Sequence, residues 1–193
     1  MKKSDILEMP EYFDRYINLV PDKELDEAFM DSLKQINELE MGILNNLEYK
    51  SYQPEKWTVK EILQHITDIE RLLCAGVLQF ARNNNTYTIS FDENEISKNS
   101  KANKKNILQI IAELISVRKA TISLYESFDN EDLLKTGINW KHRISILAMG
   151  FNIIGHQIHH LNVIKEKYYP LFICSAIPSA INLFHNAGMS FPA

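Results

Sequence analysis

The stretch from Ser145 to Tyr168 restricts the possible folds most, because it is apolar on two opposite faces of a predicted helix. One face carries Ile146, Met149, Ile153, Val163 and Ile164, and the other carries Leu147, Phe151, Ile154, Ile158 and Leu161. Side chains three and four residues apart share a helical face. A helix that is apolar all round must be covered on both sides. We therefore expect a bundle on one side and, on the other, either a second copy of the chain or residues 171–193. Pro170 predicts the end of this helix.

Two histidines of this helix lie on its first apolar face. His156 and His160 are four residues apart, which places them about 40° apart around the helix, close enough to hold one metal ion. A protonated imidazole is costly in an apolar interior, and binding a cation through the neutral ring removes that cost. His159 projects about 60° to one side, which suits a supporting or surface role. On this helix alone, the pair fits either a metal site or core histidines bonded to backbone or water.

The rest of the chain shows three further helical patterns. A short arm at residues 1–21 precedes a first helix from Asp22, as N-cap, to about Leu47. Thr58 and Glu61 form a capping box that begins a second helix of about 25 residues. A third runs from about Asn103 to Phe128. The fourth is the apolar helix, preceded by one or two turns at 129–135, a loop at 139–143 and Ser145 as N-cap.

Residues 83–102 have no sustained periodicity, and a connection of that length can cross a bundle from end to end. Helices 2 and 3 are therefore expected to be parallel. The predicted fold is an all-α four-helix bundle with a long connection between helices 2 and 3.

Charged residues near these apolar stripes are further candidates. His65 lies at the edge of the buried face of helix 2, with Asp68 one turn on. Arg118 lies in the middle of the stripe of helix 3, where a buried charge needs a partner. That partner is Asp68, Glu70 or an anionic ligand; alternatively, Arg118 reaches solvent. Cys74 lies opposite His65 and is expected to be inert.

Composition narrows the functional class. The chain has 193 residues, 45% hydrophobic and 24% charged, with a net charge of −4. This length suits one domain, and the absence of a basic surplus argues against nucleic-acid binding. Two cysteines make no disulfide framework, and no signal or membrane-spanning segment is recognisable, so we expect a cytoplasmic protein.

Several motifs, in order, resemble the DinB/YfiT-like family of small bacterial four-helix-bundle proteins over residues 12–169. They are Tyr12-Phe13-Asp14-Arg15-Tyr16-Ile17, Leu19-Val20-Pro21, the run from Pro54 to Glu61, His65-Ile66-Thr67-Asp68, Ile69-Glu70-Arg71, Phe91-Asp92-Glu93-Asn94, Val117-Arg118, and Gly155-His156 through His160-Leu161. The resemblance implies a divalent metal site formed by His65, His156 and His160, and a homodimer. We expect a DinB-like domain at residues 1–170 and a tail at 171–193 outside the resemblance.

The resemblance also implies a metal-dependent enzyme acting on a small molecule, either a hydrolase or a transferase of a low-molecular-weight thiol such as bacillithiol. Zinc or nickel is the expected metal, with iron or manganese as alternatives. Asp68 or Glu70 would act as a base or hold a ligating imidazole, and Arg118 would assist. The competing hypothesis is a non-catalytic, stress-related protein that binds a metal or small ligand. Arginines that the family pattern carries are replaced here by Gly76, Gln79 and Leu147, which puts a shared anionic substrate in question.

Overall fold

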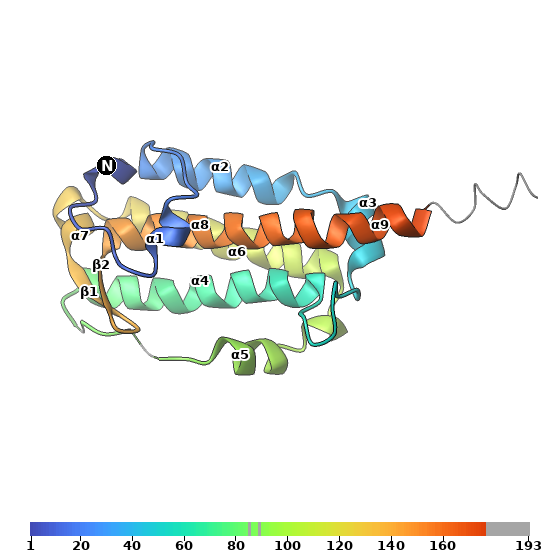
Figure 1. Ribbon diagram of the computed structural model, residues 1–193. Coiled ribbons are helices and arrows are strands. Elements are labelled where there is room, and N and C mark those ends of the chain that lie inside the picture. Colours follow the sequence, from blue (N-terminus) through green and yellow to red (C-terminus); the bar gives the residue numbers. More distant parts are fainter. Residues whose placement is uncertain (85, 89, 177–193) are drawn as a thin grey trace, which may run out of the picture.

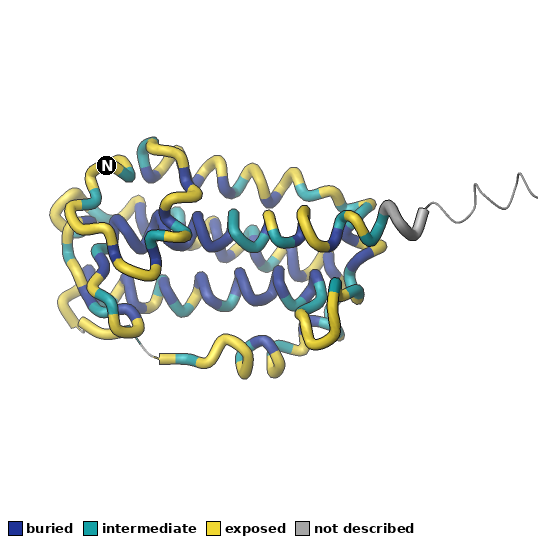
Figure 2. Tube along the Cα trace, in the orientation of Figure 1, coloured by how far each residue is buried: buried dark blue, intermediate teal, exposed yellow. Residues whose placement is uncertain are grey.

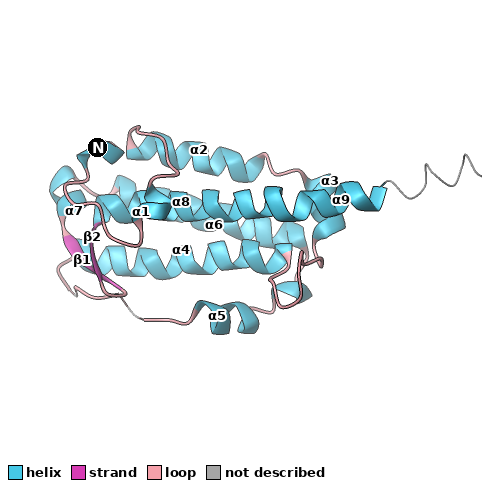
Figure 3. Cartoon of the chain, viewed as in Figure 1, coloured by secondary structure: helices cyan, strands magenta, loops and turns pink. Residues whose placement is uncertain are grey.

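The bundle is built by four long helices in the part of the chain that the computed structural model describes, residues 1–84, 86–88 and 90–176 (Figure 1). These helices are α2 (Leu25–Asn37), α4 (Val59–Ala81), α6 (Ile107–Glu126) and α8 (Ile146–Val163). The predicted four-helix bundle is thus confirmed, and helices dominate the described chain (Figure 3). Among the described residues, no helix is long and apolar enough to cross a bilayer.

The helices run in two parallel pairs. Between α4 and α6, Arg71 donates to Glu113 Oε1 at 2.6 Å, and further along Cys74 Sγ and Thr121 Oγ1 lie 3.3 Å apart. The residue numbers of the contacting pairs increase along both helices, so α4 and α6 are parallel. The prediction that these two helices are parallel is confirmed. The connection between them carries α5 (Glu93–Asn99) and a 3₁₀ turn, η2 (Ala102–Lys104), along the outside of α4 (Figure 1).

Capping residues fix several helix starts. Thr58 N donates to Glu61 Oε2 at 2.7 Å and Glu61 N donates to Thr58 Oγ1 at 3.2 Å, which confirms the predicted capping box. Ser145 accepts from Ala148 N, as expected for an N-cap. Asn103 does not begin α6, because Asn106 caps it by accepting from Leu108 N.

At Leu147, Phe151 and Ile154, the second apolar face of α8 is covered by the described chain itself, where cover by a second copy or by residues 171–193 was expected. Leu147, Phe151 and Ile154 are 0–2% exposed. They belong to a core shared with the N-terminal arm, which contains the 3₁₀ turn η1 (Lys3–Asp5) and α1 (Asp14–Ile17), and with α2. Since α1 and α2 pack on α8, its apolar faces give no support to a dimer, and the homodimer stays a prediction.

The first predicted helix is two helices. It was expected to run from Asp22 to about Leu47, but Glu24 is the N-cap of α2, and α3 (Met41–Leu47) follows a break after Asn37. Leu25 N donates to the Met1 carbonyl at 3.0 Å, so the N-terminal arm satisfies a backbone N–H in the first turn of α2. The change of direction lets α3 bury Leu44 and Leu47 completely.

A β-hairpin replaces the loop predicted at 139–143. Strand β1 (Thr136–Asn139) pairs antiparallel with β2 (His142–Ser145), after the short helix α7 (Asn130–Leu134) where turns were expected. Trp140 takes a left-handed conformation with φ of 57°, which closes the two-residue turn. Apolar alternation over four residues is too short a signal to separate such strands from a loop.

Pro170 does not end the last helix, so that prediction was wrong. A π-helical turn, η3 (Ile164–Tyr168), leads into α9 (Tyr169–Ala176), which contains Pro170. Proline removes one helical hydrogen bond, and its ring clashes with a carbonyl of the preceding turn. The wider π-helical turn before Pro170 accommodates both the missing hydrogen bond and the ring. Residues 177–193 of the predicted tail lie outside the described residues, and the domain boundary at 170 stays a prediction.

The interior consists of two apolar clusters with polar residues between them. One cluster joins the N-terminal halves of α2 and α8 to the C-terminal half of α4, and the other joins α3 to the opposite ends. Between the two lie buried polar side chains: Ser32, His65, Glu70, Arg118, His156 and Gln157. Figure 2 shows the burial concentrated along the inner faces of the long helices. The candidate site therefore lies mid-length in the bundle.

Candidate metal centre

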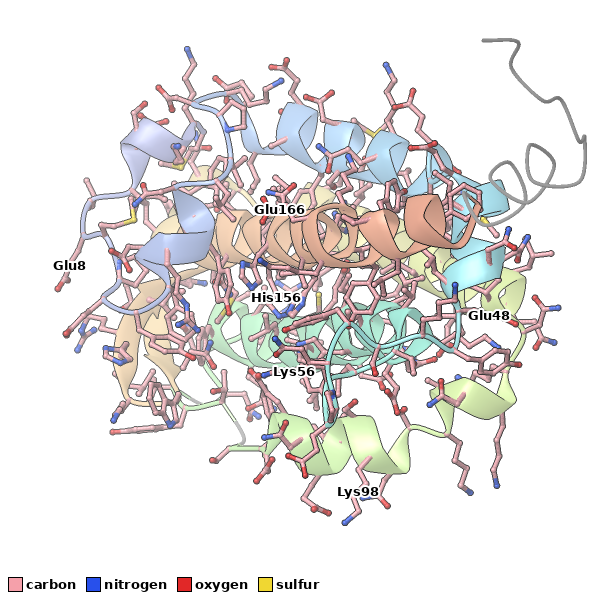
Figure 4. The ribbon with its side chains drawn as sticks, turned by 45° about the vertical axis from the view of Figure 1, so that its right-hand side comes forward. Glu8, Glu48, Lys56, Lys98, His156 and Glu166 are labelled. Carbon is pink, nitrogen blue, oxygen red and sulfur yellow. The ribbon has the colours of Figure 1, made fainter. Side chains whose placement is uncertain are left out.

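The three predicted histidine ligands meet between α4 and α8. His65 Nε2 lies 3.2 Å from His156 Nε2, and His160 Nε2 lies 3.1 Å from the same atom. One ligand atom from each residue falls within 4.8 Å of the others. Figure 4 shows His156 between the ribbons of these helices. The i and i+4 spacing on α8 supplies two ligands from one helical face, and the antiparallel α4 brings the third.

Burial keeps these imidazoles neutral. His65 is 1% exposed and His156 is 7% exposed. Burial, followed by the charge of His159, lowers the pKa of His65 from 6.5 to about 4. Burial, followed by the charges of His65 and His159, lowers the pKa of His160 to about 2, and burial also holds the pKa of His156 well below its usual value. Neutral imidazole is the form that binds metal.

The donor set fits a divalent ion. The Nε2 atoms of His65, His156 and His160 converge at a point where a single proton can join only two of them. A cation between the three nitrogens would satisfy all of them at once. Imidazole ligands suit zinc, nickel and iron, and three protein ligands leave coordination positions open.

Aromatic rings enclose the histidines. The ring of Trp57 lies 4.6 Å from that of His65 and 6.4 Å from that of His160, measured between centroids. Tyr16 packs edge-on against both His156 and His159 at 5.3 Å. His159 thus contacts the shell of the site and stays outside the converging set, in agreement with its predicted role.

Arg118 and Glu70 form a buried ion pair. Arg118 Nε donates to Glu70 Oε1 at 2.9 Å and its terminal nitrogen donates to Oε2 at 2.8 Å, while the other terminal nitrogen donates to Ser32. Both side chains are at most 2% exposed. Of the predicted alternatives for Arg118, the structure selects Glu70 as partner. The pair joins α4, α6 and α2, and a catalytic role for either residue stays a prediction.

Asp68 lies at the edge of the bundle. It accepts from Gln64 Nε2 at 3.0 Å and lies 3.6 Å from Arg71. Burial raises its pKa, against the opposing hydrogen bond from Gln64. Among the described residues, Asp68 contacts Gln64 and Arg71 and forms no hydrogen bond with a histidine, so its contacts favour a structural role over holding a ligating imidazole.

A cavity of about 170 Å³ adjoins His156. Its other lining residues come from five separate segments: Tyr12, Phe13, Tyr16, Ile69, Leu73, Ser90, Phe91, Glu93, Asn139, Trp140 and Asn152. Sequence reasoning singled out few of them for function, because no motif spacing unites them. A second cavity of about 270 Å³ adjoins His160 and His159 and is lined in part by Trp57 and Tyr168. The centre is therefore accessible from two sides.

Comparison with known proteins decides the family. A sequence profile described as the DinB superfamily matches residues 6–164. The chain belongs to the DinB superfamily. This DinB chain is also similar in structure to YfiT from Bacillus subtilis, described as a probable metal-dependent hydrolase with an unusual four-helix bundle topology. The TM-score is 0.63 at 18% identity, with 83% of this chain and 88% of that chain covered. At this identity the likeness shows the fold. No curated protein matched the sequence.

Proposed function

We propose that this DinB protein is a metal-dependent hydrolase of a small molecule, with the divalent ion held by His65, His156 and His160. The carrying observation is the convergence of three neutral imidazoles within 4.8 Å, beside a cavity. An ion bound there would act as a Lewis acid and lower the pKa of a coordinated water to about 7. The likeness to a protein described as a probable metal-dependent hydrolase supports the same reaction class.

The chain's own residues supply the remaining requirements. Hydrolysis joins a water oxygen to the carbonyl carbon and breaks the bond to the leaving group, so one water proton must be accepted and later given to that group. Glu93 is the carboxylate that lines the cavity with His156. Desolvation raises the pKa of Glu93, and the charge of Arg15 opposes this shift. The raised pKa brings the carboxylate closer to the range of a general base. We assign proton transfer to Glu93, while Tyr16 and Trp57 restrict water around the imidazoles.

Metal analysis tests the ligand set. We expect purified protein to carry close to one divalent ion per chain, zinc or nickel before iron or manganese. His65→Ala should lose most of the metal and remain helical by circular dichroism. His159→Ala is the matched control, because His159 lies beside the cluster but outside it, and this variant should keep its metal. Full occupancy in His65→Ala would remove that residue from the ligand set.

Turnover tests the reaction class. We expect hydrolysis of a panel of aryl amides and esters that stops on chelation and returns with added zinc. A reaction that requires a thiol together with an acceptor would instead support the bacillithiol-type transferase. Bound metal with no turnover of either kind would support a non-catalytic, stress-related binding protein. The net charge of −4 gives no reason to test nucleic acids.

A further inference from the structure

The short helix α1 places a phenol beside the three histidines. It packs on α8 (Figure 1), and glycine permits the approach, because a Cβ at Gly155 would lie 2.0 Å from the Tyr16 carbonyl oxygen. The ring of Tyr16 lies 5.3 Å from that of His156, measured between centroids, and forms part of the wall of the same cavity. A ligand in this cavity can therefore contact Tyr16 while it faces the histidines.

Arg15 and Tyr16 together present hydrogen-bond donors. Arg15 Nη2 donates to the hydroxyl oxygen of Tyr16 at 3.0 Å. A guanidinium has five N–H donors and no acceptor, so the phenol oxygen must accept in this bond and the phenol hydrogen points elsewhere. Among the described residues, neither that hydrogen nor the other side-chain N–H groups of Arg15 have an acceptor. The pair therefore offers two adjacent donors to one incoming acceptor group.

Two tyrosine rings hold the guanidinium of Arg15. Its central carbon lies 3.8 Å from the ring centroid of Tyr12 and 4.7 Å from that of Tyr16. Tyr12 contacts Trp140 at 5.0 Å between centroids and has a left-handed backbone with φ of 71°. This conformation costs free energy outside glycine and persists where packing holds it. Stacking leaves the N–H edge of the guanidinium free and reduces the ordering cost of binding an anion.

The charges around this part of the cavity favour a monoanion. A divalent ion on three neutral imidazoles and the guanidinium of Arg15 are positive, and the carboxylate of Glu93 in the cavity wall opposes them with a single charge. Arg15 lies close enough to Glu93 to oppose the rise in its pKa that burial causes. Among the described residues the two form no hydrogen bond or ion pair, so Glu93 leaves the donors of Arg15 free. This cation comes from α1, whereas the missing family arginines would lie at Gly76, Gln79 and Leu147.

We propose that Arg15 and Tyr16 bind a carboxylate of the substrate and hold its scissile carbonyl toward the histidines, so that the protein selects small anionic amides or esters. The inference rests on the proposed function for the reaction and adds the substrate class. The carboxylate would accept charge-assisted hydrogen bonds from both side chains. The cavity, of about 170 Å³ with a largely aromatic lining, is comparable with the roughly 150 Å³ of a cavity that binds benzene, and so suits a group of one ring.

Benzoate and benzamide test the site, because they are nearly equal in shape and only benzoate is charged at neutral pH. Dissociation constants are measured by NMR titration on the full chain as purified, and metal content and melting temperature are measured for each variant. Arg15→Gln should weaken benzoate binding about tenfold, the ratio typical of a hydrogen bond between charged groups, and leave benzamide binding unchanged. Tyr16→Phe keeps the ring and should weaken benzoate binding about fivefold. Both variants should keep their metal, so any contact of benzoate with the ion is the same in each.

Arg143→Gln is the matched control, because Arg143 is also exposed, donates to Thr136 Oγ1 at 2.9 Å and lines a different cavity. It should leave both dissociation constants unchanged. Benzoate binding that is undiminished in Arg15→Gln, or equal weakening of both probes, would overturn the proposal. A chain without metal or turnover in which Arg15→Gln still weakens benzoate alone would refute the hydrolase and keep the carboxylate site. Metal-dependent turnover together with benzoate binding that does not depend on Arg15 would do the reverse.

Discussion

Replacing Arg118 by methionine should destabilise the protein strongly while leaving its metal in place. The guanidinium is fully buried, donates twice to Glu70 and once to Ser32, and connects three helices. Its removal strands a carboxylate that is 2% exposed. Breaking one side of a buried ion pair costs about 3–5 kcal/mol. For a chain of this size that loss lowers the melting temperature by roughly 10 °C.

Urea and thermal unfolding followed by circular dichroism measure the loss. Arg71→Met is the matched control, because Arg71 is 49% exposed and pairs with Glu113 at 2.6 Å; an exposed pair contributes about 0–1 kcal/mol. A double variant, Arg118→Met with Glu70→Met, should recover most of the stability, since neither charge is then left alone. A loss below about 1 kcal/mol in Arg118→Met, together with a raised KM, would refute the structural interpretation and point to an anion-binding arginine.

Three further predictions concern the histidines, α1 and the assembly. Because the pKa of His65 falls from 6.5 unfolded to about 4 folded, the unfolded chain takes up this proton first on acidification. Metal-free protein should therefore hold its stability above pH 6.5 and lose on the order of 3 kcal/mol toward pH 4; urea midpoints that stay constant over that range would contradict this. Gly155→Ala places a Cβ 2.0 Å from the Tyr16 carbonyl oxygen and should destabilise by about 1–3 kcal/mol, whereas Gly42→Ala, with nothing within 4 Å, should be neutral or stabilise by up to about 1 kcal/mol; equal unfolding midpoints of the two variants would refute the close approach of α1. Light scattering at micromolar concentration tests the homodimer, for which a monomeric mass is the contrary result.

Local signals in the sequence predicted those parts of the fold that local chemistry determines. Thr58 and Glu61 fix the start of α4 with atoms three residues apart, and that prediction is confirmed. The break before α3 was missed, because it depends on how Leu44 and Leu47 reach a core formed by distant helices. The effect of Pro170 was predicted wrongly for a related reason. The π-helical turn that accommodates the proline within the helix is not predicted by any residue pattern.

In the candidate site, too, residues related by local spacing could be predicted, and residues brought together by distant segments could not. His156 and His160 share a face by spacing alone, while His65 joined them only through resemblance to a family, and the structure brings all three together. Glu93 appeared in the sequence only within the motif Phe91-Asp92-Glu93-Asn94, with no role assigned to it, and no pattern singled out Asn152. Their relation arises where α8 meets the connection after α4, and a contact between segments about 60 residues apart leaves no periodic trace.

The connection between the parallel helices α4 and α6 lines the cavities, whereas the interior helices carry the candidate metal ligands. It runs outside the bundle, and its α5 region contributes Glu93 to one cavity and Asn94 to the other, while all three histidines belong to the interior helices. Doubling the length of such a connection costs only about 0.6 kcal/mol in closure entropy. Apart from positions such as Ala102, which is 1% exposed in the core, residues of this connection can change without repacking of the interior helices. Divergence among relatives can thus reshape what reaches the histidines without touching the residues that hold them.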